Sequence, residues 1–181
     1  MYKTLCLLIL FGSPVFGSEL TITVDGNAKG EIKIDLFEDI APLHVTQILK
    51  LAEQGHYNDV VFHRVMDGFM AQTGDVEYGK AGNDISLAGR GGSKLPNIPA
   101  EFSDIDFDRG IVGMARTRNP DSANSQFFIM FEAGYFLNGQ YTVVGKVTSG
   151  MEVVDKIKRG EGSNGAVLGK PDKMVSIVTS R

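Results

Sequence analysis

Two stretches of the sequence combine a guanidinium, amides and large apolar side chains at strand spacing. In the segment 62–75, FHRVMDGFMAQTGD, polar and apolar residues alternate on both sides of a central Asp-Gly pair, which is typical of a tight turn. Two strands joined there place Arg64, Met70 and Gln72 on one face. Such a face lines an apolar groove that also offers hydrogen-bond donors. The alternative interpretation is an ordinary barrel core with Arg64 as a solvated strand residue.

The second stretch adds another amide and more aromatic rings. It consists of GMAR at 113–116 and NSQFFI at 124–129, with Gln126 directly before Phe127 and Phe128. Ser125 lacks the G-x-S-x-G context of a catalytic serine, so we interpret it as a strand-start residue and not as a nucleophile. Together the two stretches favour an apolar groove that also forms hydrogen bonds.

Other kinds of site find little support. The three histidines, His44, His56 and His63, have no metal-ligand spacing, and the single cysteine, Cys6, provides neither a disulfide nor a thiolate cage. The glycine-rich stretch 79–92 lacks the lysine-containing phosphate-binding pattern. A long surface loop is the favoured interpretation of it, and an anion-binding backbone nest is the alternative. We expect no metal and no cofactor.

Length, composition and charge fit one globular domain. The chain has 181 residues, of which 43% are hydrophobic and 22% are charged. Eighteen basic against 22 acidic residues give a net charge of −4, and no segment concentrates the basic ones. Nucleic-acid binding through neutralisation of phosphates is therefore not expected. We expect a monomer.

Most of the chain is predicted to be β-structure. Alternating residues predict two strands, 20–24 and 32–36, joined by a turn rich in Gly and Asn. Helical periodicity extends from Pro42 to Gly55 and again over 151–158. The other β-rich runs are 60–65, 69–73, 111–115, 127–130, 143–147 and 174–179. Two helices among about eight strands favour a mainly β fold, an antiparallel closed β-barrel capped by the helices.

The N-terminal residues 1–17 have the pattern of a secretory signal peptide. Lys3 supplies a positive charge, residues 5–11 are uninterruptedly apolar, and a helix-breaking Gly-Ser-Pro at 12–14 precedes the small residues Gly17 and Ser18. The apolar run is shorter than the stretch of about 20 residues that spans a bilayer. A buried N-terminal strand is the alternative. We predict cleavage after Gly17, a mature domain over 18–181 and a periplasmic location.

In the segments that form the groove, the sequence resembles the cyclophilin family of peptidyl-prolyl cis/trans isomerases. The motifs F-H-R-V-x-x-G-F-M-x-Q-x-G-D and S-Q-F-F-I carry this resemblance, which extends from about Leu20 to Thr179. It implies an eight-stranded antiparallel β-barrel capped by two helices. It also implies that the groove is formed by Arg64, Phe69, Met70, Gln72, Ala115, Arg116, Gln126, Phe128, Phe136, Leu137 and Tyr141.

Three of these residues depart from the best-known eukaryotic pattern. Phe136 stands where a tryptophan is usual, so the indole N–H that donates to cyclosporin is missing and we expect only weak cyclosporin binding. Tyr141 replaces a histidine, and Arg116 replaces an asparagine whose backbone holds the substrate. The run Met-Ala-Arg-Thr and Phe136 are similar to the bacterial branch of the family, which agrees with a secretory signal.

The chemistry of prolyl isomerisation fits these residue types. Rotation about an X-Pro bond breaks amide resonance over a barrier of about 20 kcal/mol, and the prolyl nitrogen becomes basic during the rotation. We assign Arg64 as the donor to that nitrogen, because a guanidinium remains charged and presents several donors in a rigid fork. Gln72 is assigned to hold the substrate carbonyl. The mechanism requires no covalent intermediate.

The sequence thus predicts an isomerase that acts on proline-containing segments of unfolded or partly folded exported proteins. The alternative is a proline-peptide-binding chaperone module that uses the same groove with little turnover. A small-ligand-binding barrel is a third interpretation, which rests on fold analogy alone.

Overall fold

The computed structural model describes residues 17–180, so the predicted signal peptide lies outside the described residues except for Gly17. Within them, nine strands form one antiparallel sheet in the order β3-β9-β1-β2-β8-β6-β7-β5-β4. No helix in this part of the chain is long and apolar enough to cross a membrane.

Most elements of the described chain are short strands, with a few helical segments between them. The strands are β1 (Glu19–Asp25), β2 (Gly30–Leu36), β3 (Val60–Val61), β4 (Arg64–Met66), β5 (Met70–Thr73), β6 (Ile111–Met114), β7 (Phe127–Met130), β8 (Val143–Ser149) and β9 (Lys173–Ser180). The helices are α1 (Pro42–Glu53) and α2 (Met151–Val154), and the 3₁₀ turns are η1 (Pro120–Ser122), η2 (Tyr135–Leu137) and η3 (Ser163–Gly165).

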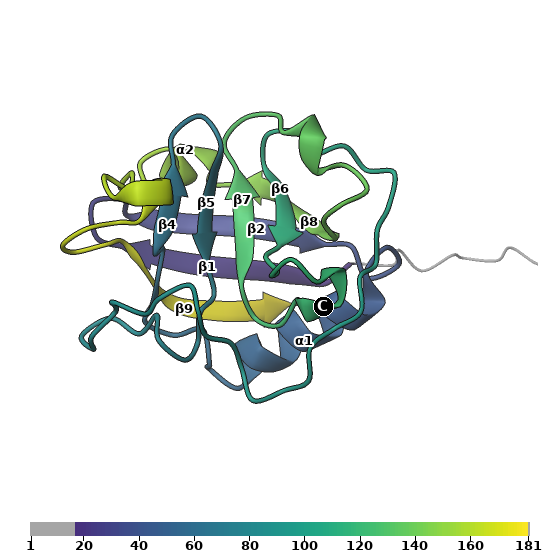
Figure 1. The fold of residues 1–181 in the computed structure, drawn as a ribbon, viewed down its shortest axis with the longest axis horizontal. Coiled ribbons are helices and arrows are strands. Elements are labelled where there is room, and N and C mark those ends of the chain that lie inside the picture. The colour runs from purple at the N-terminus through teal and green to yellow at the C-terminus, as the bar shows by residue number, and fades with distance from the viewer. Residues whose placement is uncertain (1–16, 181) are drawn as a thin grey trace, which may run out of the picture.

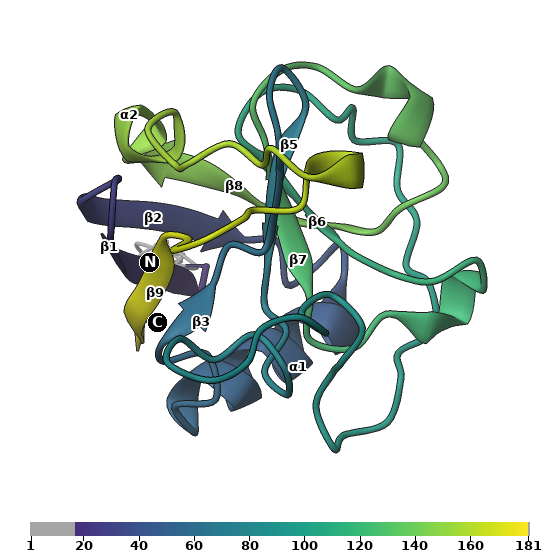
Figure 2. The same cartoon turned by 60° about the vertical axis from the view of Figure 1, so that its left-hand side comes forward.

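The sheet is strongly curled. In Figure 1, β4, β5, β7 and β6 cross in front of β1, β2 and β9, and α1 and α2 lie at opposite ends of the curl, as Figure 2 also shows. The edge strands β3 and β4 are consecutive in the chain and are separated only by Phe62 and His63. The chain itself therefore brings the two edges of the sheet together.

The predicted fold class is confirmed, with two differences in detail. The predicted strand 60–65 is divided, because the N–H of Phe62 donates to the Asp172 carbonyl and the carbonyl of His63 accepts from Val167. These bonds take the two residues out of the strand, which gives nine strands instead of eight in a sheet that is curled rather than fully closed. The second helix ends at Val154 because i→i+3 bonds replace helical ones after it.

One core unites the helices with the strands around them. In α1, which begins with a proline in its first turn, the predicted apolar face of Val45, Ile48, Leu49 and Ala52 is buried. These side chains pack in one cluster with residues of β1, β2, β9 and α2. Burial of each Val, Leu or Ile side chain contributes about 1.5–3 kcal/mol to folding, so this cluster fixes the scaffold.

A second, smaller apolar cluster underlies the predicted groove. It comprises Met70, Phe107, Ile111, Phe128, Met130, Leu137 and Val143. Gly113 makes room for its central pair of rings, because a Cβ there would lie 2.5 Å from Phe128 and 2.6 Å from Phe107. The two rings stack with their centroids 5.8 Å apart. Phe128 of β7 and Phe107, which precedes β6, thus form an aromatic floor.

Candidate active site

A cavity of about 260 Å³, here named the main pocket, opens above this floor. Its lining consists of Arg64, Phe69, Met70, Gln72, Ala115, Arg116, Phe128, Phe136, Leu137 and Tyr141. Ten of the eleven residues that the sequence placed in the groove therefore lie together. The eleventh, Gln126, lines an adjoining cavity of about 120 Å³, here named the side pocket. A larger hollow of about 430 Å³ lies beside α1, lined by several charged side chains including Glu38, Asp39 and Lys50.

Arg64 and Gln72 face each other across two neighbouring strands. Antiparallel pairing of β4 with β5 sets Arg64 directly opposite Gln72 and Met66 opposite Met70. The predicted common face of Arg64, Met70 and Gln72 is confirmed. Arg64 Nη1 donates to Gln72 Oε1 at 3.1 Å, so the strand register itself aligns the guanidinium with the amide.

The remaining donors of Arg64 fall into two groups. Asn164 accepts two bonds, from Nε to its backbone carbonyl at 2.9 Å and from Nη2 to its Oδ1 at 3.1 Å. The other contacts go to sulfur, with Nη2 at 3.0 Å from Met66 and Nη1 at 3.8 Å from Met70. Thioethers are weak acceptors, so two N–H groups are held only loosely and can turn to a ligand. Partial burial lowers the pKa of the Arg64 guanidinium below its ordinary value, and the group remains a cation at neutral pH.

A chain of amides continues from Arg64 into the side pocket. Gln72 Nε2 donates to Gln126 Oε1 at 2.9 Å, and Gln126 Nε2 donates to the Gly91 carbonyl at 2.7 Å. Each amide nitrogen carries two N–H groups, so Gln72 retains one that is available to a ligand. The orientation of Gln72, and through it that of Arg64, thus depends on the position of the Gly91 backbone.

Asp75 fixes that backbone. Its carboxylate is fully buried and accepts four backbone N–H bonds. Glu77 and Tyr78 donate to one oxygen at 3.1 and 2.9 Å, and Gly89 and Gly91 donate to the other at 2.7 and 2.9 Å. One side chain therefore holds both ends of the loop 76–92.

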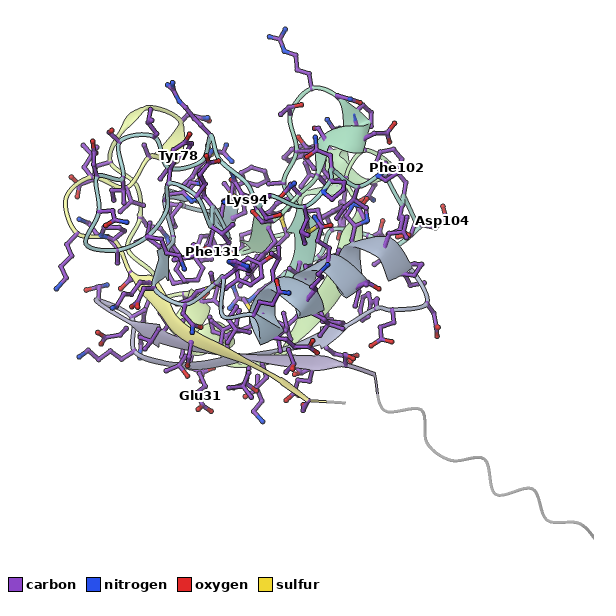
Figure 3. The ribbon with its side chains drawn as sticks, turned by 90° about the horizontal axis from the view of Figure 1, so that it is seen from below. Glu31, Tyr78, Lys94, Phe102, Asp104 and Phe131 are labelled. Carbon is purple, nitrogen blue, oxygen red and sulfur yellow. The ribbon has the colours of Figure 1, made fainter. Side chains whose placement is uncertain are left out.

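The loop 76–92 contains the glycine-rich stretch 79–92, for which the sequence left a surface loop and an anion nest open. In Figure 3 its Tyr78 lies on the opposite side of β1 and β9 from Glu31. The backbone N–H groups at both of its ends converge on Asp75, an anion of the chain itself. These donors are therefore already satisfied, which favours the loop interpretation.

Aromatic side chains form the walls of the main pocket. Phe128 is 5% exposed and meets Tyr141 edge to face, with centroids 5.9 Å apart. Phe69 lies 5.4 Å from Phe136, which is 66% exposed at the rim. Arg116 Cζ lies 4.3 Å from the ring centre of Tyr141. The result is an apolar socket with Arg64 and Gln72 on one wall and Arg116 at another.

His63 is a buried ionisable group next to Arg64. It is 7% exposed, and neither of its ring nitrogens has a hydrogen-bond partner. Burial lowers the pKa of His63 below its ordinary 6.5, although the charge of Asp75 acts in the opposite direction. The folded protein therefore binds this proton less readily than the unfolded chain does. Its folding stability consequently decreases as the pH falls through 6.5.

Replacing His63 by glutamine is expected to remove this contribution. The slope of the unfolding free energy against pH below 6.5 decreases by up to about 1.4 kcal/mol per pH unit relative to wild type. Urea unfolding over a range of pH measures it. His56→Gln serves as the matched control, because this histidine is exposed. Parallel curves for His63→Gln and wild type would contradict the assignment.

Several site features gave little signal in the sequence. Asn164 lies 100 positions from Arg64 in the sequence. The pair Asn164-Gly165 is typical of a turn, but it does not predict the contact with Arg64. Within the described residues, no group of three or more His, Cys, Asp or Glu side chains is arranged to hold a metal ion.

The fold and the main pocket define a class of protein. Among the described lining residues of the main pocket there is no serine, cysteine or histidine, while a guanidinium and an amide face an aromatic floor. These side-chain types suit non-covalent binding of a substrate better than nucleophilic attack on it. Residues 20–180 match the family model of the cyclophilin type peptidyl-prolyl cis-trans isomerase/CLD. The chain belongs to the cyclophilin family and is a peptidyl-prolyl cis-trans isomerase.

Individual relatives agree. A probable peptidyl-prolyl cis-trans isomerase of Brucella suis is 61% identical over 149 residues, which cover 81% of this chain and 76% of that protein. Peptidyl-prolyl cis-trans isomerase B of Escherichia coli is 39% identical over 137 residues, covering 71% and 79%. A cyclophilin type isomerase of Cryptosporidium parvum, crystallised in the presence of the dipeptide Ala-Pro, has a TM-score of 0.76 at 26% identity, covering 90% of this chain and 99% of that one.

Proposed function

We propose that this isomerase accelerates X-Pro rotation by hydrogen-bond donation from Arg64, without a covalent intermediate. The observation that carries the proposal is the position of the guanidinium, which Gln72 and Asn164 hold at the wall of an apolar pocket. The prolyl nitrogen accepts a hydrogen bond more strongly when rotation makes it pyramidal than in the planar amide. A fixed donor therefore stabilises the transition state more than the ground state.

The rest of the pocket immobilises one side of the rotating bond. The free N–H of Gln72 holds the substrate carbonyl, and Phe128, Leu137 and Met70 contact the proline ring from the floor. With the ring and one carbonyl fixed, rotation takes place on the other side of the bond. The Ala-Pro dipeptide used with the Cryptosporidium parvum structure supports a proline-containing ligand here.

The experiment that tests this function is cis/trans exchange of a short X-Pro peptide measured by NMR. Wild-type protein is expected to accelerate the exchange and to lose most of the acceleration on Arg64→Ala. Peptide-dependent shifts at Phe69, Gln72 and Phe128 without faster exchange would instead identify a proline-binding module.

We further propose that the clients are proline-containing segments of unfolded or partly folded proteins in the periplasm. We also propose that the protein is a monomer and belongs to the bacterial branch of the cyclophilin family. The pattern of residues 1–17 supports export, and the Brucella and Escherichia coli relatives support the branch. A pocket that contacts mainly the proline and the backbone suits many clients. Phe136, without an indole N–H, supports weak cyclosporin binding.

Export is tested by N-terminal sequencing of protein from the periplasmic fraction. We expect a mature chain that begins at Ser18. Leu8→Arg, which puts a charge into the apolar run, is expected to leave the full-length protein in the cytoplasm. An uncleaved chain in the cytoplasm for both forms would refute export.

A further inference from the structure

The side pocket adjoins the main pocket and shares part of its wall. Gln72, Ala115 and Arg116 line both cavities, and the remaining lining comes from the segments 89–91 and 117–126. One residue of an extended peptide covers about 3.3–3.6 Å. A side chain within about three positions of a proline seated in the main pocket therefore reaches the side pocket.

The charge of the two pockets opposes the charge of the chain. Their charged lining residues are Arg64, Arg90 and Arg116, and no carboxylate of the described chain lines either cavity. The chain as a whole has a net charge of −4. Three acidic residues lie within three positions of a lining residue, and none of them lines a pocket: Asp67 pairs with Arg159, and Asp75 and Asp121 accept backbone hydrogen bonds. The positive charge of the pockets is therefore not neutralised by an acidic lining residue.

Hydrogen bonds within the protein hold the Arg116 guanidinium in place but do not use all of its donors. Its Nε and Nη2 donate to the Gln140 carbonyl at 3.1 and 2.7 Å, and its Nη1 donates to the Thr117 carbonyl at 2.9 Å. Stacking on Tyr141 orients the guanidinium further. A guanidinium has five N–H groups, so two remain for a ligand.

Arg90 has an anchored backbone and a free side chain. It lies between Gly89 and Gly91, whose N–H groups both donate to Asp75. Its side chain is exposed and has no polar partner among the described residues. Two guanidinium groups that approach one small cavity from different loops suit a carboxylate, which accepts several hydrogen bonds at once.

Building on the proposed isomerase function, we infer that the side pocket selects clients with an aspartate or glutamate within about three positions of the proline. Arg90 and Arg116 are the specificity-determining residues, and the bound group is the side-chain carboxylate. Electrostatic attraction of this kind raises the association rate and favours acidic over basic segments.

A peptide series tests the inference. One X-Pro sequence is made with glutamate, glutamine or lysine at each of the flanking positions, and kcat/KM for cis/trans exchange is measured by NMR. We expect kcat/KM for glutamate to exceed that for glutamine by about three- to tenfold at the responsive position, and lysine to fall below glutamine. The ratio shrinks between about 20 mM and about 300 mM salt, because a half-exposed pair is screened.

Two matched variants test whether Arg90 causes the preference for glutamate over glutamine. Arg90→Gln is expected to bring the glutamate-to-glutamine ratio close to one, whereas Lys29→Gln, the same charge change in the turn between β1 and β2, retains it. A ratio near one in wild type, or one that survives Arg90→Gln, would overturn the inference. The glutamine peptide keeps the two hypotheses apart, since failure to accelerate even that peptide would instead refute the isomerase function.

Discussion

Replacing Arg64 by alanine is expected to lower kcat/KM for X-Pro isomerisation by about 100- to 1000-fold, the range for loss of one preorganised donor in an active site. The loss falls mainly on kcat. Gln72 keeps its bond to Gln126, and the apolar floor for the proline ring is unchanged, so peptide affinity is largely retained.

Two further variants separate the catalytic role from a structural one. Arg64→Lys keeps the charge but not the fork of donors, so we expect it to recover little activity. Arg109→Ala removes an exposed guanidinium paired with Asp155 and is expected to keep wild-type kcat/KM. If Arg64→Ala loses thermal stability in proportion to its activity while kcat of the folded fraction is unchanged, Arg64 is structural.

The groove residues were predictable because they lie in short-range patterns. Alternation at period two and an Asp-Gly turn fix the β4–β5 register, and this register sets Arg64 opposite Gln72. The family motifs then extended the site to Tyr141. The same local logic predicted the β1–β2 hairpin, which pairs directly.

Residues whose partners are distant or belong to the backbone escaped prediction. Asn164 binds Arg64 across 100 positions, and no local pattern encodes that contact. Asp75 accepts hydrogen bonds from N–H groups as far as 16 positions away. Because these donors belong to the backbone, the side-chain types of their residues do not predict the bonds. The composition of residues 60–65 predicted one continuous strand. Backbone hydrogen bonds from Phe62 and His63 to the segment 167–172 divide it into β3 and β4.

Asp75→Asn is expected to have the second large effect, on stability and on catalysis together. The amide keeps one acceptor oxygen and turns an NH₂ group toward backbone N–H groups that it cannot satisfy. Each buried donor left without a partner costs about 1–3 kcal/mol, so the free energy of unfolding decreases by about 2–5 kcal/mol. Release of Gly91 also removes the support for Gln126 and, through it, for Gln72 and Arg64.

A matched control distinguishes this positioning role from general destabilisation. Asp172 is also buried and accepts backbone N–H bonds, from Ala28 at 2.8 Å and from Lys158 at 2.6 Å, but it lines neither pocket. Asp172→Asn is expected to lose stability yet keep kcat. In Asp75→Asn, kcat of the folded protein decreases by about 10- to 100-fold, because small displacements of catalytic groups are costly. The side-chain amide signal of Gln126 in the NMR spectrum moves only in this variant. If both variants keep kcat and the Gln126 signal, Asp75 stabilises the loop 76–92 without positioning the catalytic residues.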